Sequence, residues 1–510
     1  MQHSLAGLPC RKGRWGRLAP GIHGVMGEVL LTGLVLLLSA PVLAQPLSGG
    51  AAIDQIRRPG QTELPAPEFV EPGPAPELVL PPVQPEQPAD RPGPQLRVFV
   101  SQFVLEGNTV FTDAELASIT APFEGRVITS DELLEVRNRI TLHYIEHGYI
   151  NSGAVIPDQQ VADGVITLQV VEGELTALAI SGNERLRVSY LGDRIELGAG
   201  PPLNVNSLQE RLQILQENPL VERINAALAP GARPGESELN VDVVESRPYQ
   251  LRLIADNHRP PSVGAEQGTL AGEHLNLTGR GDLLRGSVSL TEGLEDYFVE
   301  YRIPVTPHDT EIGVYFEKTD SEVVEDPFDD LDIESDSETL GLLLRQPVYK
   351  KPGEEIGLGV VLERKHSETQ LLGEKFSFAE GVDNGESDVT ALRLTQDWLR
   401  RSRDRVLAVR SAFSFGLDIL GATDNRSRPD GEFFHWLGQF QWAQRLGKGN
   451  TEMILRADAQ LSRDPLLPME KFVVGGADTV RGYRENQLVR DNGVVASLEL
   501  RVPVFREQLD

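Results

Sequence analysis

The sequence predicts a multi-domain protein in which two small α+β modules precede an antiparallel transmembrane β-barrel. Before Pro248, the order strand, Gly-Asn turn, helix and two strands occurs twice. From Pro248 onward, short segments alternate polar and apolar residues without a helix between them, which is typical of strands with two different faces. Their connections are alternately short and long, as in outer-membrane barrels.

The composition argues against nucleic acid as a partner. The 510 residues include 48 Lys and Arg against 76 Asp and Glu, a net charge of −28, and such a surface repels phosphate backbones. After Leu43, no run approaches the roughly 20 apolar residues that a spanning helix needs. Strands of a barrel are shorter and half polar, so a membrane location stays compatible with the composition.

Residues 1–44 are predicted to be a signal peptide. Basic residues precede the apolar run Val29–Leu38, and the residues before Gln45 resemble a signal-peptidase site. The only cysteine, Cys10, lies in this segment. We therefore expect an exported mature chain that begins near Gln45 and has no disulfide.

Residues 59–94 are predicted to be an extended linker, because twelve of these 36 residues are proline. Proline favours polyproline II, and the segment has too few large apolar residues to fold by itself. Ahead of it, Ala51–Arg58 within residues 45–58 could form two turns of helix, and an unstructured tail is the alternative.

Residues 97–172 are predicted to form the first module. Its expected elements are strand Phe99–Leu105, turn Gly107-Asn108, helix Asp113–Ser118, helix Ser130–His147 capped by Ser130 and closed by Gly148, and the paired strands Val155–Pro157 and Gly164–Val171. The longer helix has an apolar stripe that comprises Leu133, Leu134, Val136, Ile140 and Tyr144.

Residues 173–247 repeat this order. The expected elements are strand Ala177–Ser181, turn Gly182-Asn183, helix Ser207–Glu217, and strands Ile224–Leu228 and Glu238–Glu245. The segments GYINSGAVIPDQQVADGVITLQVVEGEL and ENPLVERINAALAPGARPGESELNVDV resemble parts of two polypeptide-transport-associated (POTRA) domains. A generic α+β binding module is the alternative.

Residues 248–510 are predicted to form the barrel, with about 12 strands present. The segments are Gln250–Asn257, Thr269–Leu277, Leu283–Thr291, Tyr297–Ile303, Glu311–Thr319, Thr339–Val348, Glu355–Glu363, Asp388–Leu399, Val406–Phe415, Phe433–Gln444, Thr451–Leu461 and Val494–Val504. If the first strand rises from the periplasm, the connection between the eleventh and twelfth segments is the sixth extracellular loop, at about residues 464–491.

Loop six carries the motif Val480-Arg481-Gly482-Tyr483 after two further glycines. This motif resembles the sixth loop of outer-membrane barrels that move or insert polypeptides. With the POTRA segments, it is most similar to the hemolysin secretion/activation transporters of two-partner secretion (TpsB type, ShlB/FhaC/HecB-like). The resemblance covers the chain from Phe99 to its end.

The resemblance implies how loop six is held. In the family this loop folds into the barrel, and its arginine meets an acidic residue on the inner wall. That residue is expected beyond Asp510, and Glu499 is an available partner within the chain. We expect Arg481 in a partly dehydrated lumen, Gly482 close to the wall and Tyr483 packed beside it. A flexible loop in water is the alternative.

The resemblance has two further implications for the architecture. Family barrels close with 16 strands, so we expect about four strands to be missing from a truncated C-terminus, since an open sheet in lipid leaves unpaired edges. A 12-stranded barrel is the alternative. The family also implies that the short helix within residues 45–58 plugs the barrel.

Client capture is predicted at the first module, because an unfolded β-rich chain can add a strand to an exposed sheet edge. Val155 and Ile156 would supply the edge. The adjoining helix would complete the groove with Leu133, Val136, Ile140 and Tyr144.

Four other patterns have simpler interpretations. His143, Glu146 and His147 fit H-x-x-E-H, but no third ligand follows, so we predict no metal site. Arg280-Gly281-Asp282 lies in a predicted periplasmic turn, where Gly and Asp favour turns. Glu322–Glu338 has nine acids and is read as a solvated loop. Aromatic residues near strand ends, which would form a membrane girdle, are Tyr349, Trp398, Trp436 and Trp442.

These features together predict an outer-membrane transporter and not an enzyme. It would recognise an unfolded β-helical exoprotein (TpsA type, such as a hemolysin or filamentous hemagglutinin) through periplasmic POTRA domains and secrete it through the barrel. We expect no cofactor and no nucleic acid, contact with outer-membrane lipid, and a monomer. The alternatives are an outer-membrane assembly or insertion factor, and a porin or surface adhesin.

Overall fold

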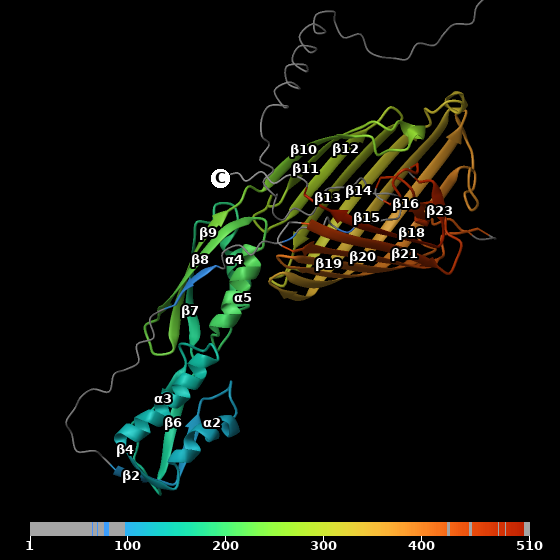
Figure 1. Cartoon of the computed structure of the whole chain (residues 1–510). Coiled ribbons are helices and arrows are strands. Elements are labelled where there is room, and N and C mark those ends of the chain that lie inside the picture. Colours follow the sequence, from blue (N-terminus) through green and yellow to red (C-terminus); the bar gives the residue numbers. More distant parts are fainter. Residues whose placement is uncertain are drawn as a thin grey trace, which may run out of the picture. The chain divides into compact units, whose positions relative to one another are not determined.

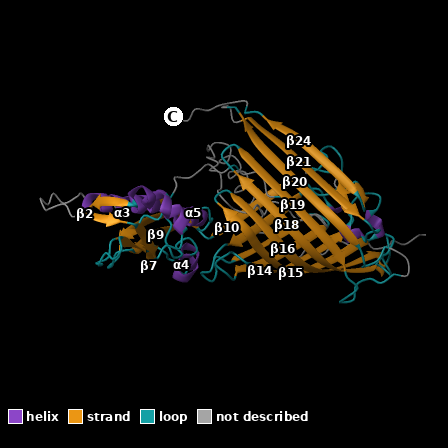
Figure 2. Ribbon diagram, turned by 90° about the horizontal axis from the view of Figure 1, so that it is seen from below, coloured by secondary structure: helices purple, strands orange, loops and turns teal. Residues whose placement is uncertain are grey.

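The structure, a computed structural model, describes residues 64, 69, 76–80, 97–425, 429–447, 451–477, 479–484 and 486–503. The predicted signal peptide, the candidate plug helix and most of the linker lie outside the described residues. Helices are confined mainly to the two N-terminal modules, and long strands make up the rest (Figure 2).

The first module packs two helices on small sheets. Its elements are β2 (Arg97–Val100), β3 (Gln102–Glu106), α2 (Asp113–Thr120), β4 (Arg126–Thr129), α3 (Ser130–Glu146), β5 (Gly153–Val155) and β6 (Val165–Val171). The sheet order is β3-β6-β5, and β2 pairs with β4. Apolar residues of α2, α3 and both sheets form one buried core.

Three expectations for this module were wrong in detail. The single strand expected at Phe99–Leu105 is two strands. The extended backbone is interrupted at Ser101, whose N–H donates to the carbonyl of Gly164 at 2.7 Å. The cap of α3 is Thr129 and not Ser130, since the Thr129 hydroxyl accepts from the Glu132 N–H at 3.2 Å. The strand expected at Val155–Pro157 is β5, which ends at Val155.

The second module repeats this arrangement and has one helix more than the sequence predicted. Its elements are β7 (Glu174–Ser181), α4 (Val188–Glu196), α5 (Val205–Gln216), β8 (Val221–Pro230) and β9 (Glu236–Glu245). Three residues of the predicted linker, β1 (Glu77–Val79), pair parallel to β8 at the edge of its sheet. This segment lies between Pro76 and Pro81 and contains no proline itself. Its residues therefore have the backbone N–H groups that strand pairing needs and that proline lacks.

The remaining strands form one large antiparallel sheet (Figure 1). In order, they are β10 (Tyr249–Asp256), β11 (Gln267–His274), β12 (Leu283–Leu290), β13 (Leu294–Pro304), β14 (Glu311–Glu322), β15 (Ile333–Lys351), β16 (Glu354–Leu371), β18 (Glu386–Arg401), β19 (Arg405–Gly416), β20 (Phe434–Leu446), β21 (Thr451–Ser462) and β24 (Gly493–Arg501). The two-residue β17 (Glu374–Lys375) adds to β16. All twelve predicted segments are therefore strands, and β10 and β24 are the edges of a sheet that does not close within the described residues.

Two strands, β15 and β16, extend beyond their predicted segments, so the loops beside them are shorter than those segments imply. The acidic segment Glu322–Glu338 is only partly loop, since β15 begins at Ile333 and its Asp336 lies opposite Asp320 of β14. Likewise, β16 runs on to Leu371. Strand pairing thus extends beyond the alternating core that the sequence pattern marks.

Alternation gives the sheet two distinct faces. On β20, the odd-numbered residues His435, Gln439 and Gln441 are buried and polar, and we call their side the inner face. The even-numbered residues between them include Trp436, Phe440 and Trp442, and we call their side the outer face. An apolar outer face and a polar inner face are what a barrel in lipid requires.

Candidate functional site: loop six on the inner face

Loop six is a folded segment between the two last strands of the sheet, β21 and β24. Its two limbs pair as β22 (Phe472–Val474) and β23 (Leu488–Arg490), with Phe472 opposite Arg490. At the turn after β22, Gly475 has φ +134°, and a Cβ there would lie 2.3 Å from the carbonyl oxygen of Arg484. Only glycine fits such a backbone, so the loop folds back on itself as the glycines indicated.

Arg481 lies near Glu499 at the tip of the loop. The Nη2 of Arg481 is 2.8 Å from Oε1 of Glu499, which belongs to the inner face of β24. Arg456 and Arg501 also approach this carboxylate, at 3.4 and 3.2 Å. Glu499, on the twelfth strand of the sheet, is therefore surrounded by three guanidinium groups.

Three expectations about the tip differ from what the described residues show. Nothing lies within 4 Å of a Cβ placed on Gly482, so its glycine is required by a φ of +89° and not by a close wall. The side chains of Arg481 and Tyr483 are 70% and 61% exposed, so neither is dehydrated or packed. Arg484 lies close to Glu325, at 2.9 Å.

The base of the loop is held by a residue that sequence reasoning missed. Glu470 is 1% exposed and accepts from Arg393 at 2.8 and 3.0 Å, from Lys365 at 2.9 Å, and lies 3.1 Å from Nε2 of His435. These partners come from β18, β16 and β20. Lysine and arginine at inner-face positions, each needing an acidic partner, are the sequence signal that could have revealed it.

The predicted client-binding edge is present but partly occupied. β5 is an edge strand, and Val155 at its end is 39% exposed. The N–H of Ala154 donates to the hydroxyl of Thr141 on α3 at 3.1 Å. A client strand would have to displace that hydroxyl to use this N–H.

The helix residues predicted to complete the groove lie elsewhere. Val136, Ile140 and Tyr144 are fully buried in the core of the module, and Leu133 and Ile156 are packed against that core. Their apolar stripe faces the sheet of their own module, as an amphipathic helix must. The groove expected beside the edge is therefore filled by the core of the module itself.

The remaining sequence patterns are accounted for locally. The rings of His143 and His147 pack against Phe111, with centroid distances of 4.5 and 5.1 Å. Asp282 of the Arg-Gly-Asp tripeptide is fully buried and accepts from the N–H of Thr278 at 2.9 Å. Within the described ranges, no group of three or more His, Cys, Asp or Glu side chains is placed to hold a metal ion.

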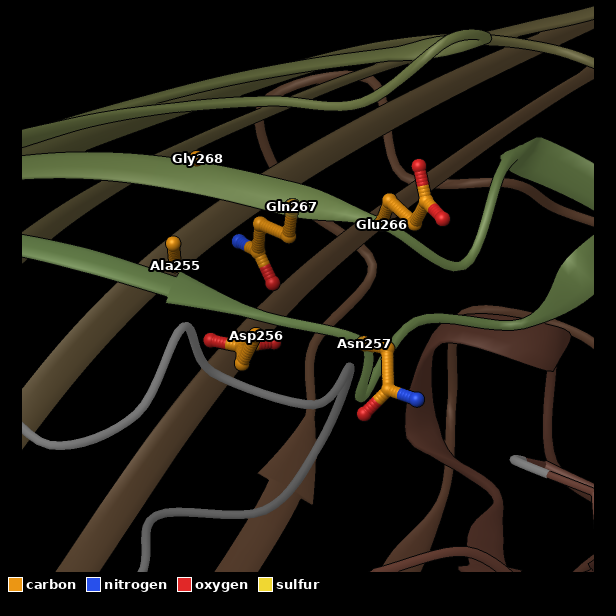
Figure 3. Close-up of a pocket in the computed structure, with 6 residues that line it drawn as sticks. All are labelled: Ala255, Asp256, Asn257, Glu266, Gln267 and Gly268. Carbon is orange, nitrogen blue, oxygen red and sulfur yellow. The ribbon is translucent and has the colours of Figure 1, made fainter. Parts of the chain in front are cut away.

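A shallow depression of about 530 Å³ lies at the ends of β10 and β11 (Figure 3). It is lined by Ala255, Asp256, Asn257, Glu266, Gln267 and Gly268. Because β10 is an edge strand, this space belongs to the open side of the sheet. We assign it no ligand.

No helix among the described residues is long and apolar enough to cross a membrane.

The model of the haemolysin secretion/activation protein family (ShlB/FhaC/HecB) matches residues 235–510, and that of the ShlB-type POTRA domain matches residues 98–173. The first of these covers more than half of the chain.

Curated relatives agree with these family matches. The outer membrane transporter CdiB of Escherichia coli O6:K15:H31 is 24% identical over 82% of this chain and 71% of its own length. The heme/hemopexin transporter protein HuxB of Haemophilus influenzae is 20% identical over 78% and 71%. The hemolysin transporter protein HpmB of Proteus mirabilis is 25% identical over 31% and 27%.

Solved structures show the same fold. CdiB from Escherichia coli superposes with a TM-score of 0.62 at 22% identity, covering 84% of this chain and 79% of that one. CdiB from Acinetobacter baumannii gives 0.56 at 16% identity, covering 94% and 85%. The predictions of family, fold class and localisation are confirmed: the chain belongs to the haemolysin secretion/activation (TpsB) family, outer-membrane proteins whose POTRA domains lie in the periplasm.

Proposed function

We propose that this protein secretes a large β-helical exoprotein, of the hemolysin or filamentous-hemagglutinin type, through its barrel and catalyses no reaction. The observation that carries the proposal is loop six, which is seated on the polar inner face with its motif arginine 2.8 Å from Glu499. A loop that is held inside a barrel can block the path of a client, and it can open that path by moving aside.

The names of relatives support transport, and one of them supports the kind of client. HpmB is named a hemolysin transporter and CdiB an outer membrane transporter. The sequence contains no G-x-x-x-x-G-K-[ST] run for nucleotide phosphates. We infer that folding of the client outside the cell supplies the free energy, as the family implies.

We propose that the client first docks on the edge of β5. Strand addition uses main-chain hydrogen bonds, so it does not demand one client sequence. The exposed edge at Val155 supports this assignment. The contact from Thr141 to Ala154 would have to open first.

The proposal is tested by secretion. The full-length protein is co-expressed in a Gram-negative host with a β-helical exoprotein of the hemolysin type, and the exoprotein is measured in medium and periplasm. We expect intact exoprotein in the medium only when the transporter is present. Exoprotein that stays in the periplasm while the amount of folded outer-membrane barrels rises would favour an assembly factor instead.

A further inference from the structure

Loop six is attached to the sheet at its base through a buried charge. The side chain of Glu470 is 1% exposed. A buried charge that loses its partners is strongly unfavourable, so this attachment is hard to break.

The base attachment joins the loop to four different strands. The carboxylate of Glu470 is bound by Arg393 of β18 and Lys365 of β16, with His435 of β20 beside it. Its backbone carbonyl accepts from the side chain of Gln460 on β21 at 2.9 Å. The contacts of this one loop residue therefore reach across several strands of the inner face.

The charges at the base are balanced only when Glu470 is in place. Arg393 also contacts Glu363 at 2.7 Å, and Lys365 lies 3.7 Å from the same carboxylate. Two cations thus face two anions, and all four side chains are at most 13% exposed. Moving Glu470 away would leave one positive charge uncompensated on the wall.

An apolar seat lies beside this cluster. Leu466 and Leu467, which precede Glu470, are fully buried against Val389, Ala391 and Phe433. The N–H of Leu466 donates to the carboxylate of Asp491 on the other limb at 3.1 Å. The base of the loop is therefore packed as well as paired.

We propose that Glu470 is a positioning residue that keeps the base of loop six fixed on the wall. Any motion of the loop that makes room for a client is then limited to the segment beyond the glycines at 475 and 476, so this inference rests on the proposed function.

The test uses the full-length protein in lipid vesicles without any client. The mature chain has no cysteine of its own, so Leu467→Cys reports the base and Tyr483→Cys the exposed tip. The rate of maleimide labelling is measured in four backgrounds: unchanged, Glu470→Gln, Arg481→Ala, and Glu432→Gln as an exposed matched control. Heat-modifiable mobility on gels verifies that each barrel is folded.

We expect Glu470→Gln to speed labelling at the base by about tenfold or more, because local opening becomes easier, and Arg481→Ala and Glu432→Gln to leave it within about twofold. Glu470→Gln with Lys365→Met, which restores the charge balance, should recover most of the protection. If Leu467→Cys is already labelled quickly in the unchanged background, the half-buried Met469→Cys replaces it.

Two results would overturn the proposal that Glu470 fixes the base of the loop. One is an unchanged base rate in Glu470→Gln with either probe, and the other is release of the base by Arg481→Ala as large as that by Glu470→Gln. Labelling requires no client, so either result leaves secretion itself untouched, and a failure of secretion leaves the labelling rates interpretable.

Discussion

Glu172 and Glu245 hold equivalent positions in the two POTRA modules, where each accepts backbone N–H groups just after the Gly-Asn turn of its module. Glu172 accepts from the N–H of Thr109 at 2.7 Å and from that of Val110 at 2.9 Å. Glu245 accepts from the N–H of Leu186 at 2.8 Å and from the two N–H groups before it. The internal repeat therefore extends to a carboxylate that organises each turn.

This relationship predicts an acid-sensitive first module. Burial alone would raise the pKa of Glu172, but hydrogen bonds from Thr109 and Val110 hold that pKa below its ordinary value of 4.5. Because the folded-state pKa is depressed, the stabilisation is present above pH 4.5 and is lost as the pH falls through the folded-state value. Glu172→Gln should cost about 1–3 kcal/mol at neutral pH.

Hydrogen exchange at the amides of Thr109 and Val110 in the full-length protein measures this effect. Glu174→Gln is the matched control, because Glu174 is exposed two residues further on. Exchange that is equally slow in Glu172→Gln and in the unchanged protein at neutral pH would show that the carboxylate does not hold the turn.

The modules show where sequence reasoning succeeds and fails. The Gly-Asn turns were found because Gly107 and Gly182 need positive φ, +89° and +78°, which sequence marks directly. Helix α4 was missed: Gly192 lies within it, and Arg187 provides no side-chain cap. A Cβ placed on Gly192 would lie at an ordinary contact distance of 3.8 Å from Leu178 and Ile180, so the helix packs on β7, and no local sequence pattern carries that contact.

The two faces of the sheet predict a position-dependent cost of charge. Leu342 near the middle of β15 is on the outer face and 54% exposed, and its neighbour Leu343 is on the inner face. Leu342→Arg should destabilise the inserted barrel by about 2–4 kcal/mol, since arginine would face lipid. Leu343→Arg should cost much less. Urea unfolding in vesicles measures both, and equal costs would contradict the assignment of faces.

The edge of β5 predicts opposite effects of two kinds of substitution on client binding. Val155→Pro with Ile156→Pro should weaken binding, because proline removes the N–H and ladder geometry. Thr141→Val should strengthen binding, because it frees the N–H of Ala154 without changing the size of the side chain. Binding is measured with an unfolded exoprotein fragment and the inserted full-length protein. A folded proline variant that binds normally would exclude this edge.

Arg481 predicts a secretion defect without a folding defect. Its pair with Glu499 is exposed, so Arg481→Ala should change stability by no more than about 1 kcal/mol. Secretion should nevertheless fall severely with normal barrel levels, because the tip loses its resting position. Arg481→Lys should restore secretion only in part, since lysine lacks the planar fork. Unchanged secretion by Arg481→Ala would remove the motif from the mechanism.

The barrel strands were predictable and the loop anchor was not. Period-two alternation marks every strand, and the errors lie at strand ends, where pairing continues through polar residues such as Asp336. Glu470 belongs to a short Pro-Met-Glu turn that carries no pattern of its own. Its role follows from its contacts with Lys365 of β16 and Arg393 of β18. Only the folded sheet brings these two residues close to Glu470.

Passage of a client along the inner face is the central claim, and site-specific crosslinking tests it most directly. A photo-crosslinking amino acid replaces either Ser497 or Leu498, neighbours that face opposite sides of β24. A client is stalled during secretion by a folded domain at its end, and crosslinks are detected on gels. We predict crosslinks to the client from position 497 and none from position 498, whereas equal yields at both positions, or none at 497 while secretion proceeds, would contradict passage through this barrel.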